Sequence, residues 1–275
     1  MIQMISAFHA DLFTFAYVPN WFESLDHLAQ LTLPEPWRFK NVDGYRKNTR
    51  TPILEKYIHA IFRAHAIDYG STADQAQKDN IFLIRKEYAV FNTGLLSRYM
   101  KPIYGYCEKN KREGTMYDWV FKGFADDSAA PLKFIHPLPR KPHATLQPTA
   151  VLYLANLPIR VNVEHMISDP DNMMRLPEWC RTFRNLSLLL ETAVETTRRM
   201  AEIRPGIVVA QVYQGRIQYL LPICLSDPAR PDLAMTITPM DGYYLCSTCL
   251  TLEMAYSNAR QLATPTVGWL TQLVE

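Results

Sequence analysis

The sequence lacks the features of a secreted, membrane-spanning or disulfide-stabilised protein. The segment from Met1 to Pro19 has no basic start and is interrupted by His9 and Asp11, so we expect no secretory signal peptide. No run approaches the roughly 18 uncharged apolar residues that a membrane helix needs. The five cysteines are an odd number scattered along the chain, a pattern typical of a reducing compartment. We therefore predict a cytoplasmic protein with no membrane partner.

The sequence also lacks a strong charge of either sign. Its 275 residues include 29 Lys and Arg against 27 Asp and Glu, and a net charge of +2 is too small to indicate a nucleic-acid partner by itself. The ten glycines and nineteen prolines show no collagen-like or linker-like period. Apolar residues make up 48% of the chain, which is enough to bury a core and excludes a disordered protein.

Hydrophobic spacing predicts an α+β fold with three main helices near residues 52–67, 177–203 and 253–262. Between them lie short apolar runs separated by few residues, so we expect hairpins, because parallel pairing needs crossovers of about a dozen residues. The expected strands are residues 81–85, 88–91, 103–107, 119–124, 150–155, 160–163, 207–213, 217–221, 233–238 and 243–250. No internal repeat or composition break is visible. We predict a single domain over residues 1–275 with a mostly antiparallel sheet: an N-terminal helix and basic loop (1–50) and an α+β core (51–275).

The most acid/base-capable cluster is Glu164, His165 and Asp169. A histidine with a nearby carboxylate can act as a general base, which makes these residues the catalytic candidates. A histidine beside a turn rich in Asp and Pro is also commonly a structural group. The sequence does not decide whether the protein is an enzyme.

A possible phosphate site follows an expected strand at Asn92, Thr93 and Gly94, with Arg98 shortly after. Backbone amides in such a turn, together with one guanidinium, can hold a phosphate. The alternative is a plain strand-ending turn, in which Asn and Gly supply unusual backbone angles. The segment is not a P-loop, because the sequence contains no G-x-x-x-x-G-K-[ST] motif.

Tyr256, Asn258 and Arg260 on the last expected helix complete the nucleotide- or RNA-binding candidates. Tyr256 and Arg260 lie one turn apart and can stack on a base, or tether the helix to the core. Basic residues of the loop 38–50 and of the segment 98–112 alternate with tyrosines. That alternation suits stacking and phosphate contacts, and it equally suits a solvated charged surface.

Cys246 and Cys249 form a C-x-x-C motif within an expected strand. Strand alternation would place their side chains on opposite faces of the sheet. With no second C-x-x-C and no spaced histidine pair, we expect no zinc, no bridge between these thiols, no other metal and no cofactor.

Several blocks of the sequence occur in an order that resembles a known family. They are Phe91–Leu95, Pro102–Tyr106, Trp119–Phe124, Asn162–Ile167, Tyr219–Ile223, Leu250–Arg260 and Trp269–Leu270. Together they resemble a bacterial domain of unknown function, number thirty-eight twenty-five in its series, over nearly the whole chain. The resemblance implies relatives joined to cold-shock-like or other RNA-binding modules, and it supplies no catalytic residue.

Two hypotheses of different classes follow. The first is an RNA- or nucleotide-binding α+β domain, which, if it is an enzyme, acts on a phosphodiester. The alternative is a non-catalytic protein-interaction or scaffolding domain; a metal-dependent hydrolase is weaker, because no compact ligand spacing exists. Convergence of the candidate side chains on one cleft favours the first hypothesis. Burial of each against a backbone partner favours the second.

Overall fold

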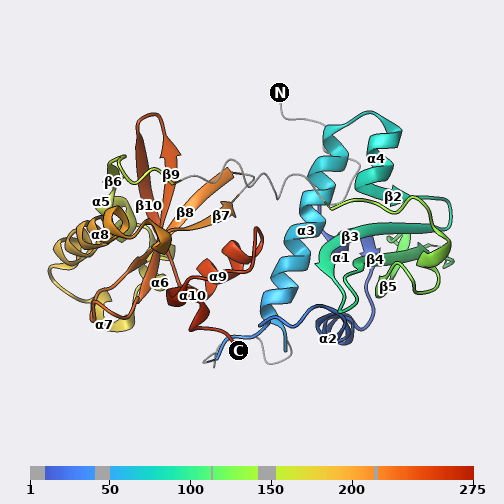
Figure 1. Cartoon of the computed structure of the whole chain (residues 1–275), viewed down its shortest axis with the longest axis horizontal. Helices are drawn as coiled ribbons and strands as arrows, with labels where there is room; N and C mark the ends of the chain where they lie inside the picture. The colour runs from blue at the N-terminus through green and yellow to red at the C-terminus, as the bar shows by residue number, and fades with distance from the viewer. Residues whose placement is uncertain (1–9, 41–49, 113, 142–152, 214–215) are drawn as a thin grey trace. The chain divides into compact units, whose positions relative to one another are not determined.

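A computed structural model describes residues 10–40, 50–112, 114–141, 153–213 and 216–275 of the chain (Figure 1). These residues form two compact units, each with its own five-stranded sheet. The first unit comprises residues 1–38, 42–146 and 275, and the second comprises residues 39–41 and 147–274. The expected α+β class and the mostly antiparallel pairing are confirmed, but two sheets replace the one that the sequence predicts. The single domain stays a prediction.

The first unit places helices before a four-stranded meander. Its elements are α1 (Leu12–Phe15), β1 (Ala16–Tyr17), α2 (Trp21–Leu31), α3 (Pro52–Ser71), α4 (Gln75–Ile81), β2 (Phe82–Ile84), β3 (Tyr88–Leu96), β4 (Pro102–Lys109), β5 (Trp119–Asp126) and η1 (Leu132–Phe134). The strand order is β1-β5-β4-β3-β2, in which β1 runs parallel to β5 and the other neighbours are antiparallel.

Aromatic packing between α3 and the meander forms the core of the first unit. Phe62 of α3 meets Phe82 and Phe91 edge-on, with ring centroids 5.6 and 5.2 Å apart. The opposite face of the sheet is also covered, because Leu132 and Ile135 pack against Leu83, Val90 and Tyr104. Strand β3 is therefore buried on both faces over most of its length.

The second unit repeats this plan. Its elements are β6 (Ile159–Val161), α5 (Val163–Ser168), α6 (Pro170–Arg175), α7 (Glu178–Arg181), α8 (Leu186–Ile203), η3 (Pro205–Ile207), β7 (Val209–Tyr213), β8 (Arg216–Ile223), β9 (Leu233–Met240), β10 (Tyr243–Leu250), α9 (Leu252–Arg260) and α10 (Gly268–Thr271). The strand order is β6-β10-β9-β8-β7, and β6 runs parallel to β10. One stripe of α8 packs on the sheet through Leu190, Ala193 and Val194.

Both units thus share one topology: an edge strand, then helices, then a four-stranded meander whose last strand pairs in parallel with the edge strand. The long helix of each unit is tied to the second meander strand in the same way. His65 Nε2 of α3 donates to the carbonyl of Asn92, and Thr197 Oγ1 of α8 donates to the carbonyl of Pro222, both at 2.7 Å. The topology repeats although no sequence repeat is visible.

The expected helices and strands lie close to where the sequence places them, with three differences. The helix expected over 177–203 is two helices, α7 and α8, separated by residues 182–185. Residues 150–152 of the expected strand 150–155 lie outside the described residues, and residues 153–155 are not a strand. Strand β3 continues through the segment expected to end it, as far as Leu96.

Candidate functional site

The Asn92–Gly94 segment is a bulge within β3. The pairing of β3 with β4 shifts register between Asn92 and Leu96, which frees backbone carbonyls from the strand ladder. Helix α3 uses these carbonyls: His65 donates to Asn92 O, and Tyr57 Oη donates to Thr93 O at 3.0 Å. At the bulge, therefore, side chains of α3 form hydrogen bonds with the backbone of the sheet.

The polar groups of the bulge are also satisfied internally. The Gly94 amide donates to Asn92 Oδ1 at 2.8 Å, and the Leu95 amide donates to Thr93 Oγ1 at 3.2 Å. The side chains of Asn92 and Thr93 donate in turn to the carbonyls of Pro139 and Ile103. These amides are the ones expected to hold a phosphate, and each already has an acceptor. The contacts are structural, but the segment is a bulge within a continuing strand and not the strand-ending turn that the sequence offers as the alternative.

His65 belongs to this arrangement, although the sequence analysis does not single it out. Its side chain is fully buried between α3 and the sheet, with its ring edge-on to Phe82 and Phe91. Burial, only partly opposed by the hydrogen bond to Asn92, lowers the pKa of His65 to about 4. The sequence feature that could have identified His65 as buried is its position four residues after Ile61, on the apolar stripe of α3.

Arg98 lies in the turn between β3 and β4, which presents three consecutive side chains to solvent. Buried Ser97 holds this turn: its Oγ accepts from the amides of Tyr99 and Lys101, and its carbonyl accepts from the amide of Met100. Arg98 is exposed, Tyr99 is 82% exposed and Met100 is 64% exposed. We refer to residues 97–101 as the Ser97 turn.

The expected basic and aromatic surface is only partly neutralised, because Arg38, Lys40, Arg98, Lys111 and Arg112 have no ion pair among the described residues. Three lysines around the first sheet each face a carboxylate, in the pairs Lys101–Asp127 (3.6 Å), Lys109–Asp118 (2.9 Å) and Lys122–Glu108 (3.4 Å). Tyr104 is buried, and the ring of Tyr106 stacks on that of Tyr88. Residues 41–49 of the basic loop lie outside the described residues.

The candidates on α9 are packed into the second unit. Tyr256 is buried, with its ring edge-on to Phe39 at 5.9 Å, and Arg260 is buried as well. The Asn258 amide donates to Gln211 Oε1 at 3.0 Å, and Gln211 donates to Gln218. Because Asn92, Thr93, Gly94 and Arg98 belong to the first unit and these three to the second, neither unit by itself contains the expected cleft.

The acid/base candidates do not form a dyad or triad. His165 is exposed on α5, and among the interactions of the described residues none joins its ring to Glu164 or Asp169. The Asp169 carboxylate caps α6, accepting from the amides of Asp171 and Asn172. Glu164 is exposed and lines a groove.

This groove lies between β6, the start of α5 and one face of α8, and its volume is about 520 Å³. Its lining residues are Ile159, Val161, Asn162, Val163, Glu164, Glu191, Val194, Glu195 and Arg198. The α8 members recur at positions i, i+3, i+4 and i+7, so they share one side of the helix. The lining combines apolar side chains with three carboxylates and one guanidinium.

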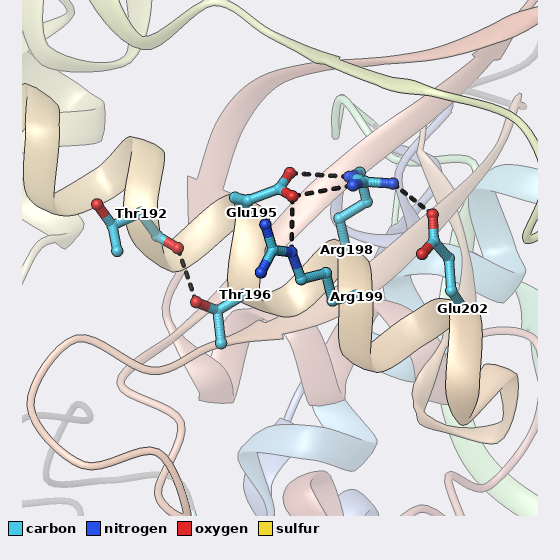
Figure 2. Close-up of polar contacts among 6 residues, drawn as sticks. All are labelled: Thr192, Glu195, Thr196, Arg198, Arg199 and Glu202. Atoms are coloured by element: carbon cyan, nitrogen blue, oxygen red, sulfur yellow. Dashed lines mark hydrogen bonds and ion pairs between the residues drawn. The ribbon is translucent and has the colours of Figure 1, made fainter.

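The guanidinium in this groove is already engaged on both sides. Figure 2 shows Arg198 between Glu195 and Glu202, with Arg199 also bonded to Glu195. Arg198 Nε and Nη2 lie 2.8 and 2.9 Å from the two oxygens of Glu195. Arg198, followed by Arg199, lowers the pKa of Glu195 to about 2, so this carboxylate stays charged. No ion pair involves Glu164 or Glu191 among the described residues.

Comparison with known families decides the membership of the chain. The family model described as "Domain of unknown function (DUF3825)" matches residues 28–269. The chain belongs to this family. No curated protein matches it in sequence, and no solved structure matches it.

The C-x-x-C motif of this family member has a geometry different from the expected one. The pairing of β10 with β9 shifts register between Cys246 and Thr248, which places Cys246 opposite Ile237 and Cys249 opposite Met235. These partners are two residues apart on β9, so both thiols lie on the same face, within one core cluster. The prediction of opposite faces is wrong because the bulge breaks the alternation. Burial raises the pKa of both thiols, that of Cys249 to about 12.

Two further properties of the described residues bear on function. These residues contain no group of three or more His, Cys, Asp or Glu side chains placed to hold a metal ion. Among their helices, none has both the length and the apolar character needed to span a bilayer.

Proposed function

We propose that the protein is a non-catalytic protein-interaction domain, and that the Ser97 turn is a recognition element. The observation that carries this proposal is the turn itself, in which Arg98, Tyr99 and Met100 are exposed on a backbone fixed by Ser97. Tyrosine and arginine are the residue types most enriched at interface hot spots, and a fixed backbone reduces the entropy lost on binding. The exposed side chains of Leu33 and Leu96 flank the turn, since the Leu33 amide donates to Leu96 O.

The charges around the turn favour a protein partner over RNA. An RNA strand needs several unpaired cations to replace its counterions. The nearest lysine, Lys101, already faces Asp127, whose carboxylate would repel a phosphate. One arginine beside apolar and aromatic side chains matches a protein interface better than a phosphate track.

Further support comes from the roles of the other candidates. Asn92, Thr93 and Asn258 bond to groups of their own unit, and Tyr256 is buried. Of the sequence candidates for nucleotide or RNA binding, Arg98 stays exposed, beside the exposed Tyr99 and Met100. The second unit also exposes large apolar and aromatic side chains, of which Met174, Trp179, Phe183 and Leu188 lie in the segment 174–188.

The test uses the full chain with an affinity handle in the cells that make it. We compare wild type with Arg98→Ala/Tyr99→Ala, using Tyr213→Ala as the control for loss of an exposed tyrosine. We expect a protein bound by wild type and the control to be reduced at least about tenfold on the double variant, because two hot-spot side chains are removed. The purified partner must reproduce this difference by calorimetry.

Binding of mixed-sequence single-stranded RNA is the opposing outcome. If wild type binds this RNA more tightly than about 1 mM and Arg98→Ala weakens the binding, the nucleic-acid hypothesis replaces the proposal. If the same protein partner is retained by wild type and by the double variant, the Ser97 turn is not the recognition element.

A further inference from the structure

We infer that the groove between β6 and α8 binds an extended segment of a partner protein, and that a lysine or arginine of this segment lies between Glu164 and Glu191. The groove belongs to the second unit and the Ser97 turn to the first, so this inference and the proposed function are carried by different observations.

The charge of the groove selects a cationic occupant. Glu195 and Arg198 satisfy each other, with Arg199 and Glu202 completing the network (Figure 2). Glu164 on α5 and Glu191 on α8 both line the groove, and neither has an ion-pair partner within the described part of the chain. Two uncompensated carboxylates from different helices attract an ammonium or guanidinium group and repel a phosphate or carboxylate.

The apolar lining suits the rest of a long cationic side chain. Ile159 and Val161 of β6 and Val194 of α8 line the same groove. Lysine and arginine bury their aliphatic stems against such surfaces while the charged end stays hydrated or paired. The absence of a three-ligand metal cluster among the described residues leaves an organic cation as the chemistry that the lining fits.

The sheet edge beside the groove explains why the occupant is extended. Strand β6 ends the strand order of the second sheet, and within the described residues its strand partner is β10 on one side. An exposed edge offers unpaired backbone groups to an added strand, and alternate side chains of that strand point to one face. One side chain of the added segment therefore faces α8 while its backbone follows β6.

The experiment selects ligands for the full chain from a phage-displayed library of random octapeptides. We expect enriched peptides to carry Lys or Arg at one central position with apolar residues two positions away, and to lack Asp and Glu there. The best peptide is synthesised and titrated by fluorescence anisotropy against wild type, Glu164→Gln, Glu191→Gln and the double variant. Glu178→Gln on α7 is the control, because it removes an exposed carboxylate that does not line the groove.

We expect Glu164→Gln/Glu191→Gln to weaken binding at least about tenfold, and replacement of the central Lys by Met to weaken it similarly, because both remove charge-assisted contacts. Glu178→Gln should bind as wild type does. An absence of enrichment, enrichment of acidic peptides, or a selected peptide indifferent to the double variant would each overturn the inference. None of these results affects the test of the Ser97 turn, which removes residues of the other unit.

Discussion

His65 is a titratable side chain that the fold uses in its neutral form. It is enclosed by aromatic rings and donates from Nε2 to a carbonyl that the β3 bulge exposes. Protonation would place a charge in this apolar site, which is why its pKa falls to about 4 from an ordinary value of 6.5. The same side chain at the surface would suggest acid/base chemistry, so burial decides its role.

We expect His65 to make the first unit sensitive to mild acid. Because the folded pKa lies below the unfolded value, the unfolded chain binds the proton more readily between about pH 6.5 and 4. The contribution of neutral His65 to the free energy of unfolding is fully present above about pH 6.5. It is lost as the pH falls towards 4, by up to about 3 kcal/mol. Urea unfolding across this range should show a flatter dependence for His65→Gln than for wild type. Exposed His27→Gln is the control and should keep the wild-type slope.

The side chains that could be assigned from the sequence are those whose role depends on nearby residues. Asp169 caps α6 through amides two and three residues after it, so the local Asp-Pro sequence could have indicated this role, although the sequence analysis takes Asp169 as a catalytic candidate. Asn92 and Thr93 could not be assigned, because their partners Pro139 and Ile103 are distant in the sequence. The groove carboxylate Glu191 carries no local motif, and its position became apparent only once α8 and β6 were brought together.

At the scale of elements, hairpins were predictable and bulges were not. The hairpins β2–β3 and β7–β8 follow from alternating apolar runs joined by short turns. The bulges in β3 and β10 depend on register against neighbouring strands, which a single strand's pattern does not encode. For this reason the faces of Cys246 and Cys249 were wrongly expected to differ.

Gly94 should be the residue on which the β3 bulge depends most. Its φ of +72° is a conformation that side chains disfavour, and a Cβ there would lie 2.9 Å from Tyr57 Oη and 3.0 Å from Lys141 Cε. We expect Gly94→Ala to lower the free energy of unfolding by about 1–3 kcal/mol. Gly70→Ala is the matched control, because a Cβ at this helical position meets nothing within 4 Å and alanine favours the helix. Equal stabilities of the two variants in urea would contradict this view of the bulge.

At the scale of the molecule, the repeated topology is the property that the sequence conceals. The edge strands β1 and β6 are short, and each pairs in parallel with a strand that follows it by more than 80 residues. Pairing between strands so far apart is not visible in the local hydrophobic pattern, and the sequence analysis therefore predicts one sheet. The same topology can form from different residues as long as the same positions are buried. His65 in one unit and Thr197 in the other, for example, make equivalent hydrogen bonds to the sheet with different side chains.

Because the two units have separate sheets, we predict that the chain unfolds in two cooperative steps. In the second unit, Leu221 of β8 is fully buried in a core cluster whose members all lie between residues 163 and 249. Leu221→Ala should cost about 2–5 kcal/mol, because it leaves a cavity that the surroundings fill only partly. If each sheet belongs to its own cooperative unit, amide protection falls in β7–β10 and stays unchanged in β2–β5.

The reciprocal variant completes this test. Phe91→Leu in β3 removes aromatic packing from the first unit, where Phe91 contacts Phe62 and Phe82. Hydrogen exchange followed by mass spectrometry should then show faster exchange in β2–β5, with β7–β10 unaffected. Loss of protection in both sheets from either variant would instead mean that the chain unfolds as the one domain predicted from its sequence. The two patterns differ in which peptides exchange, so they remain distinguishable even where the overall loss of stability is the same.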